Sequence, residues 1–134
     1  MKRLVPLAAI AAIIAVGGQA SAHHSGAMFD DKKTLVFENA TVKEFQWSNP
    51  HAWLEVSVPT ATGPQDWSLE MVGLGGMRRA GWKFNSVKPG DKIKVTVNPT
   101  RDGSHGGRAD LVTLADGKVL RGQGPVRPNG APAE

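Results

Sequence analysis

The segment that most constrains the fold is 51–58, in which apolar residues alternate strictly with other residues. One set is Ala52, Leu54, Val56 and Val58, and the other is His51, Trp53, Glu55 and Ser57. A period of two places the two sets on opposite faces of a β-strand, with successive same-face residues about 6 to 7 Å apart. The Asn49-Pro50 pair just before it favours a turn. The segment therefore predicts a half-buried strand after a chain reversal.

Other short stretches with strand-like patterns are separated by turn sequences. They are 34–47, 67–71, 92–98, 109–114 and 118–121. The first loses its alternation around Glu38-Asn39-Ala40, which predicts a bulge. In the second, Trp67, Leu69 and Met71 share the expected inner face, so Glu70 is expected to point outward and to be accessible. Glycines weaken the helical pattern of residues 72–82, so only a turn or two of helix is expected there.

This series predicts a mainly all-β domain. About five short strands with a weak helix between the third and fourth are typical of a small OB-like barrel, and a β-sandwich is the alternative. In OB-type barrels the outer surface of strands two and three commonly holds the binding site. The expected site face is therefore His51, Trp53, Glu55 and Glu70.

The first 22 residues have the pattern of an export signal. Lys2 and Arg3 precede an apolar run from Leu4 to Val16, and Ala20-Ser21-Ala22 is a small-residue cleavage site. The run is shorter than the roughly 20 residues that cross a bilayer. We therefore predict a periplasmic or secreted bacterial protein without a stable membrane anchor after cleavage. The expected segments are a signal peptide (1–22), a flexible N-terminal arm (23–28), a β-barrel domain (29–121) and a disordered tail (122–134).

Composition narrows the possible chemistry. The chain has no cysteine, which excludes disulfides and thiolate metal sites. Its formal charge is only +4, two units of which leave with the signal, and no block of Lys or Arg marks a nucleic-acid or membrane patch. No nucleophile elbow, phosphate loop or catalytic-triad spacing is present, so no enzymatic activity is expected.

Several short motifs, taken together, resemble a known family. They are Ala22-His23-His24-Ser25, Phe29-Asp30, Asn49-Pro50-His51-Ala52-Trp53, the 67–71 strand, Gly81-Trp82, Val87-Lys88-Pro89-Gly90-Asp91 and Ala115-Asp116-Gly117. The chain is similar, over nearly the whole domain after the signal, to a family of small exported bacterial proteins classed as a domain of unknown function. The resemblance implies an exported β-rich domain and supplies no activity.

Histidine near the new N-terminus suggests a metal site. Cleavage after Ala22 would place the free α-amine and the imidazole of His23 together, with His24 and His51 available to add nitrogen ligands. Such ligands suit Cu(II) best among common divalent ions, and cleavage after Ala20 would also leave a copper-competent terminus. Zinc is the alternative ion and would need a carboxylate such as Glu70 or Asp30 to complete a tetrahedral set.

A binding module without a metal is the alternative function. In that case His23 and His24 are polar residues of a frayed arm, and Trp53, Glu55 and Glu70 form a platform for a small ligand or a periplasmic partner. The partner would then be a peptide, a glycan or another protein. Whether the N-terminal arm folds back onto His51 separates the two hypotheses.

We predict that the chain is exported and loses its signal, because the charged start, short apolar run and small-residue site occur in the order that signal peptidases recognise. Intact-mass measurement of protein recovered from the periplasm should give a chain that starts at His23 or Ser21. A product that retains Met1, or one confined to the cytoplasm, would contradict both the localisation and the terminal-amine ligand.

Overall fold

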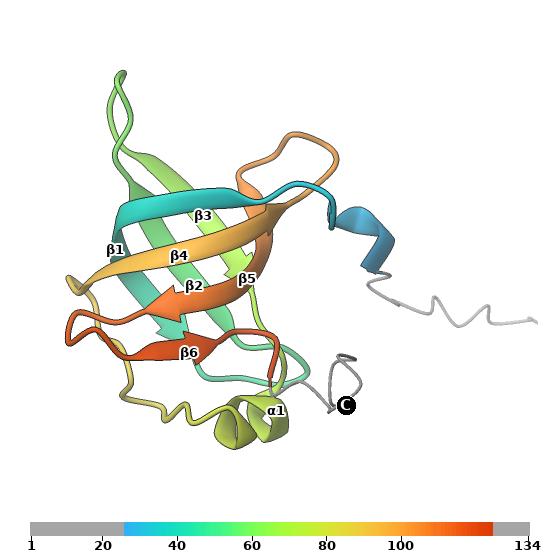
Figure 1. Cartoon of the computed structure of the whole chain (residues 1–134), viewed down its shortest axis with the longest axis vertical. Helices are drawn as coiled ribbons and strands as arrows, with labels where there is room; N and C mark the ends of the chain where they lie inside the picture. The colour runs from blue at the N-terminus through green and yellow to red at the C-terminus, as the bar shows by residue number, and fades with distance from the viewer. Residues whose placement is uncertain (1–25, 125–134) are drawn as a thin grey trace, which may run out of the picture.

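A computed structural model describes residues 26–124, and they form a small β-barrel with one short α-helix (Figure 1). The strands are β1 (Leu35–Gln46), β2 (Trp53–Val58), β3 (Gln65–Glu70), β4 (Lys92–Pro99), β5 (Gly106–Thr113) and β6 (Val119–Arg121). A 3₁₀ turn, η1 (Gly26–Met28), precedes them, and the helix α1 (Leu74–Arg79) lies between β3 and β4. No helix within the described residues is long and apolar enough to cross a membrane.

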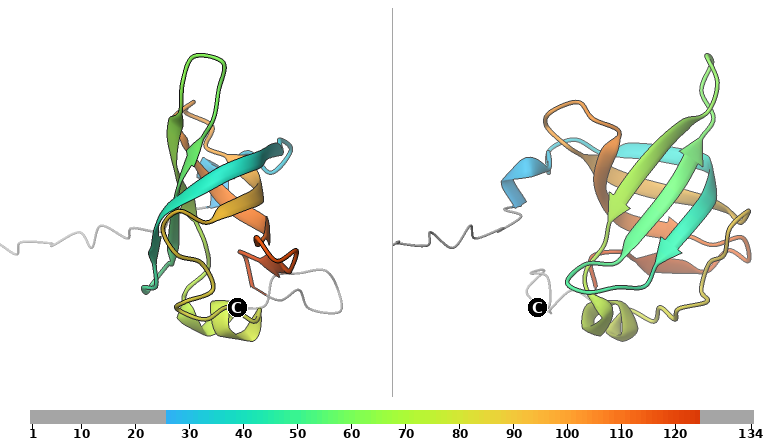
Figure 2. Two further views of the ribbon diagram at one scale, coloured as in Figure 1. Left: turned by 90° about the vertical axis from the view of Figure 1, so that its left-hand side faces the viewer. Right: turned by 180° about the vertical axis from the view of Figure 1, so that it is seen from behind.

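The sheet closes on itself. Its strand order is β3-β2-β1-β4-β5-β6, and β3 also pairs with β5, so five strands complete a ring while β6 extends it beside β5 (Figure 2). All pairings are antiparallel except the closing β3–β5 pair, which is parallel. This arrangement confirms the predicted OB-like five-stranded barrel with one short helix. A sandwich would instead have two separate sheets.

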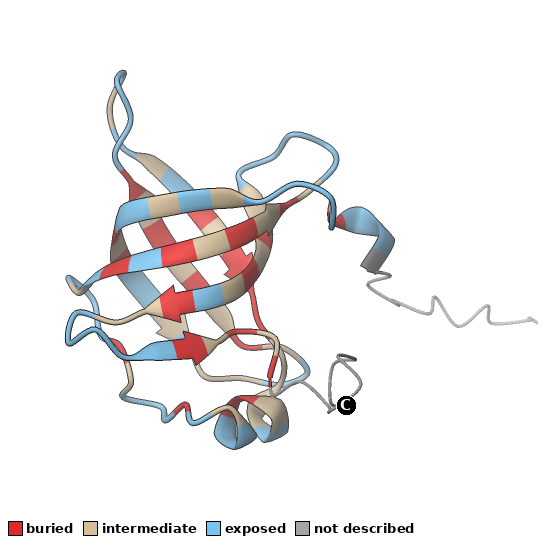
Figure 3. Ribbon diagram, viewed as in Figure 1, coloured by how far each residue is buried: buried red, intermediate tan, exposed pale blue. Residues whose placement is uncertain are grey.

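The apolar face of each strand fills the barrel. Alternation along segments 51–58, 67–71 and 92–98 predicts seven buried residues, and all seven are buried with at most 3% of their surface exposed: Ala52, Leu54, Val56, Leu69, Ile93, Val95 and Val97. Figure 3 shows the same alternation of buried with more exposed positions along the strands. Trp67 and Trp82 are also buried, as expected for large aromatic rings in a domain without disulfides, whereas Trp47 is half-buried.

Strand β1 is long because it pairs with both β2 and β4. Its register against β4 shifts between Phe37 and Ala40, at the place where the sequence predicts a bulge, and its register against β2 shifts between Val42 and Glu44. Bulges bend a strand and increase its twist, which lets β1 turn around the barrel.

Strand β5 begins earlier than the sequence predicts. We expected a loop up to Gly107, but Gly106 and Gly107 pair with Ser68 and Leu69 of β3. At Gly107 a Cβ atom would lie 2.3 Å from a Val97 methyl carbon and 2.8 Å from the carbonyl oxygen of Asn98. The glycine is required because β4 and β5 approach too closely there for a side chain.

The Lys88-Pro89-Gly90-Asp91 motif is a structural turn that leads into β4. The Asp91 carboxylate accepts hydrogen bonds from both the ammonium (2.6 Å) and the backbone N–H (3.0 Å) of Lys88. The side-chain bond first, and the backbone bond second, lower the pKa of Asp91 below its ordinary value. The motif therefore stabilises the chain reversal.

The predicted signal peptide and most of the predicted arm and tail lie outside the described residues. At the N-terminal boundary, Phe29 is buried and forms a β-bridge with Thr100. At the other boundary, the Gly122 carbonyl oxygen accepts a hydrogen bond from the Val72 N–H, and the Gly122 N–H donates to the Asp110 carbonyl oxygen. The Gln123 side-chain amide donates to the carbonyl oxygens of Glu70 and Ala109. The barrel's ordered contacts therefore extend as far as Gln123.

Replacing Val95 by Asp should destabilise the barrel by several kcal/mol, on the order of 3 to 5, because it places a carboxylate in the apolar interior without a partner. Val36→Asp is the matched control, since Val36 is a valine of the neighbouring strand with 49% of its surface exposed. Its effect should stay below about 1 kcal/mol. Chemical denaturation measures both, and equal losses would mean that the strand faces are assigned wrongly.

Candidate functional site

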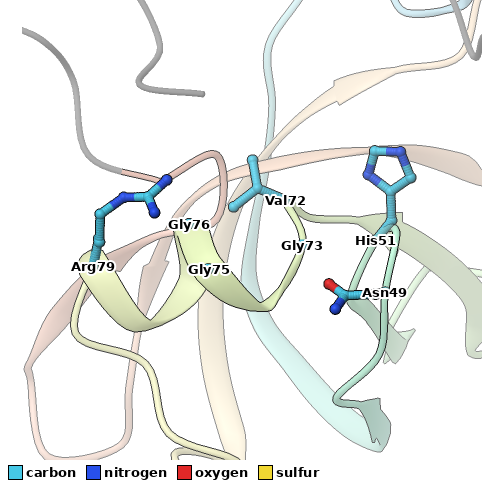
Figure 4. A pocket seen from close by; sticks show the side chains of 7 residues that line it. All are labelled: Asn49, His51, Val72, Gly73, Gly75, Gly76 and Arg79. Carbon is cyan, nitrogen blue, oxygen red and sulfur yellow. The ribbon is translucent and has the colours of Figure 1, made fainter.

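The candidate site lies at one end of the barrel, where β2 begins and where the chain leaves β3 for α1. A cavity of about 430 Å³ opens there. Figure 4 shows its lining side chains, with His51 on one side and Arg79 of α1 on the other. The lining residues are Asn49, His51, Val72, Gly73, Gly75, Gly76 and Arg79.

The Asn-Pro-His turn is joined directly to the helix. The Asn49 side-chain oxygen accepts a hydrogen bond from the backbone N–H of Leu74 at 2.9 Å, so it satisfies one of the free donors at the start of α1. The Asn49–Pro50 peptide bond is cis. The Ser48 hydroxyl donates to the carbonyl oxygen of His51 at 2.8 Å. The Asn49 contact holds the turn against α1, and the Ser48 contact holds His51 within the turn.

Gly73 allows the turn and the helix to come together. A Cβ atom at this position would lie 2.5 Å from the Pro50 carbonyl oxygen and 2.9 Å from the Asn49 side-chain oxygen. Both distances are shorter than van der Waals contact, and the first neighbour is backbone that cannot rotate away. The cavity therefore depends on glycine at the N-cap of α1.

His51 is anchored through one ring nitrogen. Its Nδ1 lies 3.2 Å from the carbonyl oxygen of Met71 and 3.3 Å from Oε1 of Glu70. A carbonyl oxygen can only accept, so the bond to Met71 requires Nδ1 to hold the proton. In the neutral ring Nε2 then has the lone pair and is the acceptor nitrogen of the imidazole.

Glu70 is buried, and the prediction that it is accessible is wrong. It lies on the outer face, paired in register with Trp53 of β2 and Arg108 of β5, but only 6% of its surface is exposed. Neighbours on both sides cover it because β3 is an interior strand of the closed sheet. Its Oε2 is buried without a hydrogen-bond partner among residues 26–124. Glu70 therefore contacts His51 on the Nδ1 side of its ring and does not face solvent.

The other two predicted face residues do lie outside the core. Trp53 is half-buried, and Glu55 is half-buried with its Oε1 accepting a 2.7 Å hydrogen bond from the Ser68 hydroxyl. The structure thus brings His51 and Glu70 together, with Trp53 beside Glu70 and Glu55 one step further along β2. Only His51 of these four residues lines the cavity.

The expected metal ligands His23 and His24 lie outside the described residues. Between residues 26 and 124, no group of three or more His, Asp or Glu side chains is arranged to hold a metal ion. The described part of the site therefore provides the His51 imidazole in a fixed orientation, with the Glu70 carboxylate on its Nδ1 side. Any complete metal site would need further ligands from elsewhere.

Sequence reasoning missed the helix side of the cavity. The sequence predicts only a weak helix in this segment, although five of its residues form most of the wall of the cavity: Val72, Gly73, Gly75, Gly76 and Arg79. The available signal was the density of glycines in a segment that still becomes helical, because closely spaced glycines often mark places where another backbone approaches.

The chain belongs to the family of unknown function DUF6152, whose model matches residues 11–109. This confirms the predicted membership of a family classed as a domain of unknown function. No curated protein and no solved structure matches the chain.

Gly73→Ala should destabilise the protein by about 1 to 3 kcal/mol, because the new methyl group meets the Pro50 carbonyl oxygen and forces the turn away from α1. Gly75→Ala is the matched control. Its Cβ would meet only the end of the flexible Arg79 side chain, at 3.4 Å, and alanine favours helix, so stability should rise by up to about 1 kcal/mol. Thermal unfolding compares the two variants. Equal tolerance of both would show that the close approach at Gly73 is not needed.

Proposed function

We propose that the protein binds one transition-metal ion, with Cu(II) preferred, through Nε2 of His51 and the N-terminal residues His23 and His24. The observation that carries the proposal is the anchoring of His51 Nδ1 by Met71 and Glu70. Metal-binding histidines almost always donate their second ring N–H to a carboxylate or a backbone carbonyl, which fixes the tautomer and raises the basicity of the ligating nitrogen. His51 has both kinds of partner.

In this proposal Glu70 orients the ligand and does not bind the metal itself. Its carboxylate is almost fully buried, and it lies on the Nδ1 side of the imidazole. A negative charge placed there also favours a cation held at Nε2, because the low-dielectric surroundings weaken screening. This role replaces the sequence-based assignment of Glu70 as an accessible ligand-binding residue.

The path of the chain supports participation of the N-terminal arm. Phe29 lies under the guanidinium of Arg108, which is 5.5 Å from the centre of its ring, and Arg108 is the register neighbour of Glu70. The chain therefore joins the barrel at Thr100, just after β4, with the Phe29 ring against Arg108 of β5, the strand beside β3. Because η1 occupies Gly26–Met28, His24 can reach at most about 13 Å from Phe29, enough to cross two strands, which lie about 4.8 Å apart.

The ligand set favours copper. Removal of a signal peptide in the periplasm would free an α-amine at His23, and an amine with imidazoles forms the nitrogen-rich set that Cu(II) prefers. Zinc is the alternative, but it would require three or four protein ligands in a tetrahedral arrangement. The proposed role is binding without catalysis.

Mature protein that starts at His23 should bind one Cu(II) far more tightly than a chain with an additional N-terminal Met, because the extension removes the amine from its place beside the His23 ring. His51→Ala should also weaken binding, but less than the extension does. His105→Ala is the matched control, since His105 is an exposed histidine in the β4–β5 loop, stacked on Trp67 and remote from the cavity lining. A competitive titration with a chelator of known affinity measures all four proteins.

Two results would contradict the proposal in different ways. Equal weakening by His51→Ala and His105→Ala would indicate unspecific binding by surface histidines. If no protein binds copper or zinc below the micromolar range, the metal function is wrong and the Trp53 face becomes the place to search for a ligand.

Glu70→Gln tests the orienting role separately. Glutamine keeps an acceptor oxygen near Nδ1 but removes the charge, so copper affinity should fall about 10- to 100-fold while the stoichiometry stays at one. Unchanged affinity in this variant, with His51→Ala still weakened, would show that the carboxylate is structural only.

A further inference from the structure

The connection between β3 and β4 is strongly cationic. From Val72 to Gly90 it contains Arg78, Arg79, Lys83 and Lys88 and no Asp or Glu. Lys88 is neutralised by Asp91. Among residues 26–124, no salt bridge to a carboxylate involves Arg78 or Lys83. The connection includes α1 and lies at one end of the barrel (Figure 1).

The same end exposes a large aromatic ring. Phe84 has 72% of its surface exposed, the highest value among the exposed large apolar residues of the described chain. It borders a shallow cavity of about 310 Å³ together with Trp47, Arg78, Trp82 and Lys83. Phe84 is therefore exposed at a cavity that it shares with the cations Arg78 and Lys83.

The residues behind Phe84 are fixed. Trp82 is 2% exposed, its indole N–H donates to the carbonyl oxygen of Arg121 at 2.9 Å, and its ring packs on Phe45. The Arg78 guanidinium lies 5.7 Å from the centre of the Trp47 ring, and Trp47 packs edge-on against Phe45. We name Trp47, Arg78, Lys83 and Phe84 the aromatic-cationic patch.

We propose that the aromatic-cationic patch docks the protein on the surface of an anionic lipid membrane. Phenylalanine and tryptophan rings enter the boundary between headgroups and acyl chains, while Lys and Arg remain at the level of the anionic headgroups. Each cation near such a surface contributes about 1 kcal/mol, equivalent to about a fivefold change in partitioning. One inserted ring and two cations, Arg78 and Lys83, give weak, reversible and salt-sensitive binding.

The form of the patch favours a membrane over an acidic protein segment. A stable protein interface buries roughly 800 Å² on each partner around a closely packed apolar centre. Here a single ring projects, its apolar neighbours are partly or fully covered, and the charge has one sign. A fluid lipid surface can accept an exposed ring beside cations without a matching shape, whereas a protein partner would need one. Anionic lipid is therefore the occupant that fits the patch.

Co-sedimentation with lipid vesicles tests the proposal. The chain that starts at His23 is used, because residues 4–16 would themselves enter lipid, and it retains every strand of the barrel. It should bind vesicles of phosphatidylcholine mixed with phosphatidylglycerol but not vesicles of phosphatidylcholine alone, and added salt should release it. Phe84→Ala should lower partitioning about tenfold and Lys83→Gln about fivefold.

Matched variants control for exposure and charge. Val119→Ala removes an apolar side chain that is 54% exposed on β6, and Lys94→Gln removes a cation on β4. Both should leave partitioning unchanged. Equal losses from the controls and the patch variants would overturn the proposal, as would binding that ignores lipid charge or salt. If a poly-glutamate peptide binds through Phe84 and Lys83 while vesicles do not, the patch recognises an acidic protein segment and the membrane assignment is wrong.

Discussion

The parallel pairing of β3 with β5 is the constraint on which the rest of the structure depends. It closes a sheet that would otherwise have an open edge, and it turns β3 from an edge strand into an interior one. On its other side β5 packs against β4, and at Gly107 these two backbones leave no room for a side chain. The β3–β5 pairing also places Arg108 beside Glu70 and thereby buries a carboxylate on what is formally the outer face.

Burial of Glu70 gives the site its chemical character. A carboxylate at this position in an open sheet would be solvated and would interact weakly with its neighbours. Within the closed barrel it lies against Nδ1 of His51, which the Met71 carbonyl oxygen also holds. The Asn-Pro-His turn is fixed at the same end by the Asn49 cap on α1 and by the close approach at Gly73. The barrel thus presents one oriented imidazole at a cavity. The segment that leaves this site continues into the aromatic-cationic patch, so metal binding and membrane docking would occur at neighbouring surfaces.

Local sequence patterns predicted the parts of the fold that depend on local physics. Alternation in 51–58 and 92–98 identified the inward faces, and the broken alternation near Asn39 identified the bulge of β1. The number of strands and the weak helix were enough to indicate an OB-like barrel. The errors concern contacts between distant segments. Alternation predicted that Glu70 faces outward but could not show that β5 covers it. Gly106-Gly107 resembled a loop because paired glycines are typical of turns, and their pairing with Ser68 and Leu69, 38 residues earlier, leaves no local signal. The patch was not predicted because two cations are too few to form a basic run, and Trp47 joins them from a distant segment only when the barrel folds.

The central claim is that Nδ1 of His51 donates its proton to Met71 and Glu70, which makes Nε2 the nitrogen proposed to bind the metal. The tautomer of His51 in the metal-free protein tests this claim most directly, and long-range ¹H–¹⁵N correlation spectra distinguish a protonated from an unprotonated ring nitrogen. At a pH where the ring is neutral, the account predicts a protonated Nδ1 and an unprotonated Nε2. A His51 ring protonated at Nε2 would contradict it, because the nitrogen proposed to bind the metal would then hold the proton.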